Sequence, residues 1–272
     1  MRVGLIQLNG SDAPATNLVQ MEQMIAEAAA DGAELVATPE VCNCISTSRS
    51  HQNAVLQHEE DDETLAALRA GAKQNGIWLL IGSIALKTSD ADGRFANRSF
   101  LVGPDGQVAA RYDKIHMFDV TVSEAETYHE SKGYRPGVGT AVTTTPLGTI
   151  GMTVCYDVRF PQLYRDLAQA GAEIITVPAA FSAVTGAAHW EVLLRARAIE
   201  NGCFILAPAQ TGQHNRRSTY GHSLVVDPWG TVVLDMGDQP GWACVDIDLG
   251  QVATIRQKIP SLSHDRAYTQ PL

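Results

Sequence analysis

The chain has 272 residues, of which 45% are hydrophobic and 18% are charged, a composition that predicts a globular protein of one large or two small domains. Its 20 Lys and Arg residues against 30 Asp and Glu residues give a formal net charge of −10, which disfavours nucleic acids and anionic membranes as partners. No stretch approaches the roughly 20 consecutive apolar residues that a membrane span requires.

The first half of the chain alternates strands and helices. The opening MRVGLIQLNG runs directly into a strand over 2–8, so we expect no secretion signal, and a helix follows over about 15–30. The strand ELVATP ends at a proline directly before Glu40. A second helix is predicted for DDETLAALRAGAKQNG by its acidic start, its apolar face and its Asn-Gly stop. The strand WLLIGSIAL and a hairpin turned at Pro-x-Gly then lead to Lys114.

A long irregular segment follows Lys114. The run HMFDVTVSEAETYHESKGYRPGVG has no clear periodicity, and it predicts a structureless loop of the kind that usually carries function in a compact domain. Glu130 lies in this segment close to a turn signal. We expect residues 124–133 to roof a binding pocket.

The second half repeats the pattern of the first in the same order. DGAELVATPE at 31–40 matches AGAEIITVPA at 170–179, and RSFLVGPDGQVAARY from Arg98 matches HSLVVDPWGTVVLDM from His222. A helix over 161–170 and another in HWEVLLRARAIENG occupy corresponding places. Two similar α/β halves, each with one helical layer, pack most economically sheet against sheet. The sequence thus predicts a four-layer α-β-β-α sandwich with an internal pseudo-two-fold duplication; one doubly wound sheet is the alternative.

Cys155 lies where a strand over 149–155 gives way to a polar turn and a helix. The first turn of a helix offers unpaired N–H groups and a partial positive charge, which stabilise a thiolate and later an oxyanion. Cys155 is therefore a candidate nucleophile; the alternative is a packed structural thiol. Because ligands gather at the carboxyl ends of strands, we expect Glu40 and Cys155 to point into one shared pocket.

Two charged residues could assist such a nucleophile. Glu40 is a candidate general base at the end of an apolar strand, with a hydrogen-bonded turn residue as the alternative. Lys114 closes a hairpin strand, and its ammonium would stabilise an oxyanion or a thiolate. A solvated lysine at a strand end is the alternative for Lys114.

The other cysteines predict no metal site. Cys42 and Cys44 form a C-x-C pair without the second pair of a zinc site, and Cys203 and Cys244 lie in apolar strand runs that predict core positions. Five cysteines are an odd number in a chain too large to need disulfides, so we expect reduced thiols and a cytoplasmic location.

Taken together, these residues resemble the carbon–nitrogen hydrolase (nitrilase) superfamily, whose signature is a Glu, Lys, Cys triad in this order. LVATPE carries Glu40, RYDKIHMFD carries Lys114 and GMTVCYDVRFPQLY carries Cys155. The resemblance covers essentially the whole chain, so it implies one domain over 1–272.

The resemblance also implies a mechanism that needs no metal or cofactor. Cys155 would attack an amide carbonyl to form a thioester, and Glu40 would pass the thiol proton to the leaving amine. Lys114 and a backbone N–H near Tyr156 would hold the oxyanion. Glu130 falls where the family carries a supporting glutamate and would position Lys114 or the substrate.

The substrate implied by the resemblance is a small linear amide. PAAFSAVTGAAHWEVLLRARAIE and the run from QTGQH to DPWG most resemble the deaminated-glutathione amidases, which release 2-oxoglutarate and cysteinylglycine. An ω-amidase acting on 2-oxoglutaramate and an N-carbamoyl-amino-acid amidase are the alternatives. Arg159 is the candidate clamp for a substrate carboxylate, with a helix-start salt bridge as its alternative, and Phe181 and Thr185 would line the same pocket. Arg216 and Arg217 are further candidates for the carboxylates.

Other classes of function remain as rivals. A catalytically idle binding scaffold would lack a member of the triad, and all three are present. A Cys-His hydrolase using His189 or His222 is a second rival. The family usually forms homodimers, and the resemblance therefore implies one here.

Overall fold

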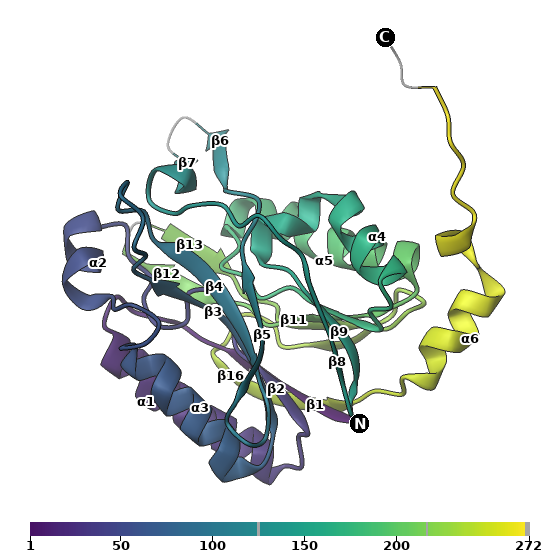
Figure 1. Ribbon diagram of the computed structural model, residues 1–272, viewed down its shortest axis with the longest axis horizontal. Coiled ribbons are helices and arrows are strands. Elements are labelled where there is room, and N and C mark those ends of the chain that lie inside the picture. Colours follow the sequence, from purple (N-terminus) through teal and green to yellow (C-terminus); the bar gives the residue numbers. More distant parts are fainter. Residues whose placement is uncertain (124–125, 216, 270–272) are drawn as a thin grey trace.

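The computed structural model describes residues 1–123, 126–215 and 217–269 and consists of two six-stranded sheets packed face to face (Figure 1). In the first sheet, β1, β2 and β3 run parallel to one another. The strands β16, on one side, and β4 and β5, on the other, pair antiparallel with their neighbours. Its order is β16 (Gly241–Asp246), β1 (Arg2–Gln7), β2 (Leu35–Ala37), β3 (Trp78–Leu86), β4 (Ala96–Val102) and β5 (Val108–Asp113).

The second sheet has the same plan. Its three inner strands β9, β10 and β11 are parallel, and antiparallel strands flank them on both sides. Its order is β8 (Ala141–Thr145), β9 (Gly148–Met152), β10 (Ile174–Thr176), β11 (Phe204–Ala207), β14 (Leu224–Val226) and β15 (Val232–Asp235). The two sheets therefore correspond strand for strand, as the sequence repeats predict.

Helices cover the outer face of each sheet (Figure 1). The first sheet carries α1 (Pro14–Ala30) and α3 (Glu63–Asn75), and the second carries α4 (Pro161–Gln169) and α5 (Ala183–Asn201). Two smaller helices, α2 (Arg49–Val55) and α6 (Gly250–Lys258), lie at the periphery. None of the helices among the described residues is long and apolar enough to cross a membrane.

Successive side chains along the strands contribute to two separate apolar layers. On β1, Val3 and Leu5 belong to the apolar cluster that also contains Ile150 and Met152 of the second sheet, whereas Ile6 joins the cluster with the inner faces of α1 and α3. Successive side chains of a strand point to opposite faces, so each strand is apolar on both. The predicted four-layer α-β-β-α sandwich is confirmed, and the alternative of one doubly wound sheet is wrong.

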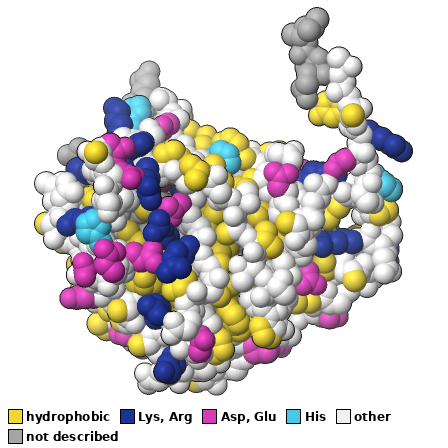
Figure 2. Space-filling model, viewed as in Figure 1, with side chains coloured by type: hydrophobic (Ala, Val, Ile, Leu, Met, Phe, Trp, Pro, Cys, Tyr) yellow, Lys and Arg dark blue, Asp and Glu magenta, His cyan; other side chains and the backbone are white. Residues whose placement is uncertain are grey.

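Two local expectations need correction. The segment after Lys114 is not structureless, because β6 (Asp119–Ser123) and β7 (Glu126–His129) pair in an antiparallel hairpin followed by a 3-10 turn over Glu130–Lys132. Its Thr, Val and Tyr residues favour strands, and the run is too short to show periodicity. The strand predicted over 149–155 ends at Met152, and Cys155 instead opens a 3-10 turn over Cys155–Arg159. On the face seen in Figure 2, acidic and basic side chains gather together mainly on the left, and hydrophobic side chains occupy much of the centre.

Candidate active site

A cavity of about 360 Å³ lies beside the loops that follow the parallel strands of both sheets. Its lining includes Glu40, Lys114, Glu130 and Cys155, four residues that lie far apart in the sequence. A volume of this size is in the range of sites for small molecules. The structure thus brings the four predicted catalytic residues to one place.

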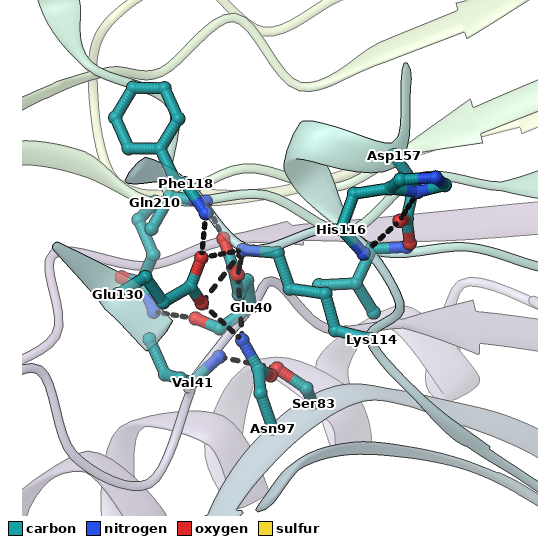
Figure 3. Close-up of polar contacts among 12 residues, drawn as sticks. Glu40, Val41, Ser83, Asn97, Lys114, His116, Phe118, Glu130, Asp157 and Gln210 are labelled. Carbon is teal, nitrogen blue, oxygen red and sulfur yellow. Dashed lines mark hydrogen bonds and ion pairs between the residues drawn. The ribbon is translucent and has the colours of Figure 1, made fainter. Parts of the chain in front are cut away.

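Hydrogen bonds fix both the side chain and the backbone of Glu40 (Figure 3). Its carboxylate Oε1 accepts hydrogen bonds from Lys114 Nζ at 2.9 Å and from Asn97 Nδ2 at 2.8 Å, and Oε2 accepts one from the Ala180 N–H at 2.8 Å. The Gln210 side-chain amide donates to the Glu40 carbonyl oxygen at 3.0 Å. Both the carboxylate and the backbone of Glu40 are therefore fixed, and the residue is only 4% exposed.

The backbone around Glu40 is tightly constrained. The next residue, Val41, has a φ of +42°, which is strained for a β-branched residue, and its N–H donates to Ser83 Oγ at 2.8 Å. A Cβ added to Gly82 would lie 1.8 Å from the Thr38 carbonyl oxygen, so only glycine allows β3 to pass so close to this turn. These contacts aim the Glu40 carboxylate into the cavity.

Lys114 lies between two carboxylates. Its Nζ is 2.9 Å from Glu40 Oε1 and 2.8 Å from Glu130 Oε2, and Glu130 Oε2 also accepts the Phe118 N–H at 2.6 Å (Figure 3). Burial alone would lower the pKa of the Lys114 ammonium, but the charges of Glu130 and Glu40 outweigh burial and hold its pKa well above the usual value. Lys114 is thus a permanent cation inside the cavity.

Asn97 is a member of this cluster that sequence reasoning missed. From β4, its Nδ2 reaches both carboxylates, Glu40 Oε1 at 2.8 Å and Glu130 Oε1 at 3.4 Å. The side chain is 1% exposed, and its Oδ1 has no hydrogen-bond partner among the described residues. An amide in the interior of the strand ANRSFLV was the available signal, since a buried polar group requires partners.

Cys155 lies in a strained turn at the start of its 3-10 segment. Its φ is +49°, and its N–H donates to the Pro178 carbonyl oxygen at 2.9 Å. The next N–H, that of Tyr156, has no acceptor among the residues that the structure describes. Burial raises the pKa of the Cys155 thiol well above its usual value; Glu40 adds to the increase and Lys114 opposes it. The free site therefore holds a thiol beside a carboxylate.

Asp157, which sequence reasoning also missed, ties the cysteine turn to the strand end that carries Lys114. Its fully buried carboxylate accepts hydrogen bonds from the Val154 N–H at 2.9 Å, the Tyr112 hydroxyl at 2.7 Å and the His116 N–H at 3.0 Å. Tyr112 and His116 lie on either side of Lys114 in the sequence. Asp157 thus fixes the two segments relative to each other.

The structure places the predicted substrate-binding residues unequally. Tyr156, Phe181 and Thr185 line the cavity. Arg159 is not among the residues that line it: its guanidinium lies 5.3 Å from the ring centroid of Phe181 and 5.9 Å from that of Tyr156, with a nitrogen 3.3 Å from His189 Nδ1. Residues three apart eclipse in a 3-10 turn, so Arg159 follows Tyr156 and comes to lie beside its ring.

The basic loop of the second half reaches the cavity instead. Arg217, at the start of β13 (Arg217–Tyr220), lines it, whereas Arg216 lies outside the described residues. Neither rival histidine, His189 or His222, is among the lining residues, and His222 Nδ1 lies 3.0 Å from Asp235. The described part of the cavity wall therefore gives no support to a Cys-His pair built on these histidines.

The remaining cysteines occupy apolar or peripheral positions. Cys42 and Cys203 are fully buried, Cys244 is half-buried on β16, and Cys44 lies at the cavity wall with its thiol 3.4 Å from the Asp12 carbonyl oxygen. Within residues 1–123, 126–215 and 217–269, no group of three His, Cys, Asp or Glu side chains is arranged to hold a metal ion.

Comparison with known proteins decides the family. The family model for carbon-nitrogen hydrolases matches residues 2–257. The chain belongs to the carbon–nitrogen hydrolase family. A protein of Yersinia enterocolitica named deaminated glutathione amidase is 43% identical over 266 residues, covering 97% of this chain and 92% of the relative.

Solved structures extend the comparison to the fold. The crystal structure of the C. elegans NitFhit protein matches with a TM-score of 0.90 and 35% identity, covering 97% of this chain; the chain spans 65% of the length of that protein. Saccharomyces cerevisiae Nit3, a member of the nitrilase superfamily, matches with a TM-score of 0.85 and 28% identity, covering 96% of this chain and 94% of Nit3. This carbon–nitrogen hydrolase therefore has the nitrilase fold.

Proposed function

We propose that this hydrolase cleaves the amide of deaminated glutathione, giving 2-oxoglutarate and cysteinylglycine, with Cys155 as nucleophile. The observation that carries the proposal is the buried cluster of Glu40, Lys114 and Glu130 in the same cavity as Cys155. The name of the Yersinia enterocolitica relative supports the choice of substrate. Chain and relative share 43% identity along nearly their whole length.

In the acylation step, the Cys155 sulfur forms a bond to the amide carbonyl carbon while Glu40 takes the thiol proton. The elevated pKa of the thiol means that the thiolate forms only as the proton moves to Glu40 during attack. Lys114 lines the same cavity as Cys155, and the Tyr156 N–H has no acceptor among the described residues, so these two donors stabilise the oxyanion. The C–N bond then breaks, and Glu40 returns its proton to the leaving amine.

In the deacylation step, water enters after the amine has left. Glu40 removes a proton from the water as its oxygen attacks the thioester carbonyl. The C–S bond breaks, the thiolate regains the proton from Glu40, and the acid leaves. Glu130 keeps Lys114 in place throughout, because both oxygens of its carboxylate accept hydrogen bonds from Nζ, at 2.9 and 2.8 Å.

The wider setting belongs to the same proposal. We assign the chain over 1–272 to one domain, because the two sheets share a single apolar cluster. All five cysteines are unpaired, which supports a reducing compartment such as the cytoplasm. Exposed apolar side chains on α5, Val184, Val192 and Ile199 among them, support a homodimer.

The experiment is a comparison of kcat/KM for deaminated glutathione, 2-oxoglutaramate and an N-carbamoyl amino acid, with Cys155→Ala as the blank. The proposal expects the highest value for deaminated glutathione and no turnover by the variant. A higher value for 2-oxoglutaramate would make the protein an ω-amidase. Turnover by the variant would remove Cys155 from its role.

A further inference from the structure

The basic side chains that line the cavity differ in whether they already have a hydrogen-bond or ion-pair partner. Lys114 is held by two carboxylates, and Arg49 donates to the Gly133 carbonyl oxygen at 2.8 Å while its guanidinium lies 3.8 Å from the centroid of the Phe95 ring. Lys132 and Arg217 also line the cavity, but among the described residues no carboxylate lies within ion-pair distance of either. Within the described part of the chain, these two cations of the cavity wall have no ion-pair partner.

Arg217 is the better placed of the two. It begins β13, which pairs with β12 (Thr211–His214), and its guanidinium lies 4.5 Å from the ring centroid of Tyr128 on β7. This contact joins a hairpin of the second half to the β6–β7 hairpin after the first half. Because Arg217 is exposed and still lines the cavity, it stands at the cavity mouth.

One oxygen of the nearby Glu126 carboxylate, Oε1, is already engaged. It accepts hydrogen bonds from the Tyr128 hydroxyl and, at 2.7 Å, from Ser182 Oγ. A guanidinium stacked on an aromatic face keeps its N–H edge free for a planar partner, and a carboxylate is the partner that fits this edge in bidentate fashion. The Tyr128 ring thus orients Arg217 without neutralising it.

We propose that Arg217 binds the carboxylate of the leaving amine, an assignment that rests on the proposed function. The chain has a net charge of −10 and already holds two carboxylates in the cavity, so a cation at the mouth is what allows an anionic substrate to enter. The amine must leave through the mouth before water reaches the thioester. A leaving group of two residues places its carboxylate up to about 7 Å from the scissile nitrogen, so this carboxylate can reach a cation that does not touch Cys155.

The test uses two substrates that differ only at this carboxylate: deaminated glutathione and the same molecule with a C-terminal carboxamide. Arg217→Gln should lower kcat/KM about tenfold for the acid and leave the carboxamide unchanged. The loss should come from KM, because a group far from the scissile bond is bound equally in the ground and transition states. Arg217→Lys should recover part of the loss.

Lys132→Gln is the matched control, since it removes one positive charge from the same cavity. It should affect both substrates equally and only slightly. Raising the salt concentration should lower kcat/KM for the acid in the wild type and less steeply in Arg217→Gln.

Three outcomes would overturn the assignment. Equal losses on both substrates would place Arg217 away from this carboxylate, for example on that of the 2-oxoacid end. A loss selective for the acid in Lys132→Gln but not in Arg217→Gln would move the role to Lys132. If the wild type hydrolysed neither substrate, the proposed function itself would fail, and this assignment with it.

Discussion

The two halves of this protein share a fold but place different residues at equivalent strand ends. In the first half Pro39 is followed by Glu40, and in the second half Pro178 is followed by Ala179. Lys114 corresponds to the exposed Asp238. In the other direction, Cys155 corresponds to Leu8, which is fully buried.

The two halves share a framework but differ in the residues that they bring to the cavity. In the proposed mechanism the acid–base and cationic groups come from the first half and the sulfur from the second. The residue of the second half that corresponds to Glu40 is Ala179. The N–H of the next residue, Ala180, donates to the Glu40 carboxylate at 2.8 Å. The halves therefore depend on each other for one site.

The largest effect should come from the residue that only the second half provides. Cys155→Ala should lower kcat by about 10⁴-fold or more, because the nucleophile is lost. Cys203→Ala removes a fully buried thiol that packs in the core, and it should retain activity while costing about 1 kcal/mol of unfolding free energy. Steady-state kinetics and denaturant unfolding separate the two. Comparable losses of kcat in both variants would show that a general packing defect is being measured.

The next largest effect should come from the first half. Glu40→Gln should lower kcat by roughly 10²- to 10⁴-fold through loss of the base. The same substitution should lower the pKa of the Cys155 thiol, because the Glu40 charge raises that pKa in the native protein. The pH at which the rate of alkylation by iodoacetamide increases should therefore be lower in the variant than in the wild type.

Glu130→Gln is the control for the charge effect. Glu130 also raises the pKa of the Cys155 thiol but is the smaller contributor, so its alkylation profile should move in the same direction by less. A profile that stays in place or moves to higher pH in Glu40→Gln would contradict the electrostatic coupling between the two halves.

Asn97 is a third difference between the halves, because the equivalent position of the second half is Gly221. Asn97→Ala removes the donor shared by Glu40 and Glu130 and should lower kcat roughly 10- to 100-fold. Asn43→Ala removes another buried amide, one that only bonds the Ala85 backbone, and should cost stability without lowering kcat. Equal kcat losses would reduce Asn97 to a structural role.

The smallest effect concerns the helices that cover the two sheets. Asp62 caps α3 by accepting the Leu65 N–H at 2.7 Å, whereas Ser182 before α5 makes no cap hydrogen bond and donates to Glu126 instead. Burial raises the pKa of Asp62 to about 6, so the folded state binds more protons than the unfolded state between about pH 4 and pH 6, and stability falls as pH rises through this window.

Asp62→Asn keeps the cap and removes this titration. The variant should gain about 1 kcal/mol relative to the wild type when the pH is raised from 4 to 7. Urea unfolding at both pH values measures the difference. The raised pKa of Asp62 would be contradicted if the unfolding free energy of the wild type increased from pH 4 to pH 7 by more than that of Asp62→Asn.

Much of this architecture is accessible from the sequence, and the exceptions have a common physical cause. The repeated strand ends at Pro39 and Pro178 reflect local patterns, and so do the helices α1 and α3. The pairing of β16 with β1 joins Arg2 to Asp246, a contact between distant segments that no local pattern encodes. In the first sheet β16 is the edge strand beside β1, just as β8 is the edge strand beside β9 in the second.

The site follows the same rule. Glu40, Lys114 and Cys155 each follow the end of a strand by no more than about three residues, and this position is visible in the sequence. Asn97 and Asp157 were missed because their roles arise only when distant donors and acceptors converge on them. Arg159 is not among the residues that line the cavity but lies beside the rings of two that do, Tyr156 and Phe181, and its role as a carboxylate clamp stays a prediction.

The most direct test of the account is the mass of the enzyme quenched in acid during turnover of deaminated glutathione. A covalent intermediate built from both halves predicts a population heavier by one 2-oxoglutaryl group, with the added mass on the peptide that contains Cys155 and absent from Cys155→Ala. Product formation with the added mass on another residue, or undiminished turnover in Cys155→Ala, would contradict it.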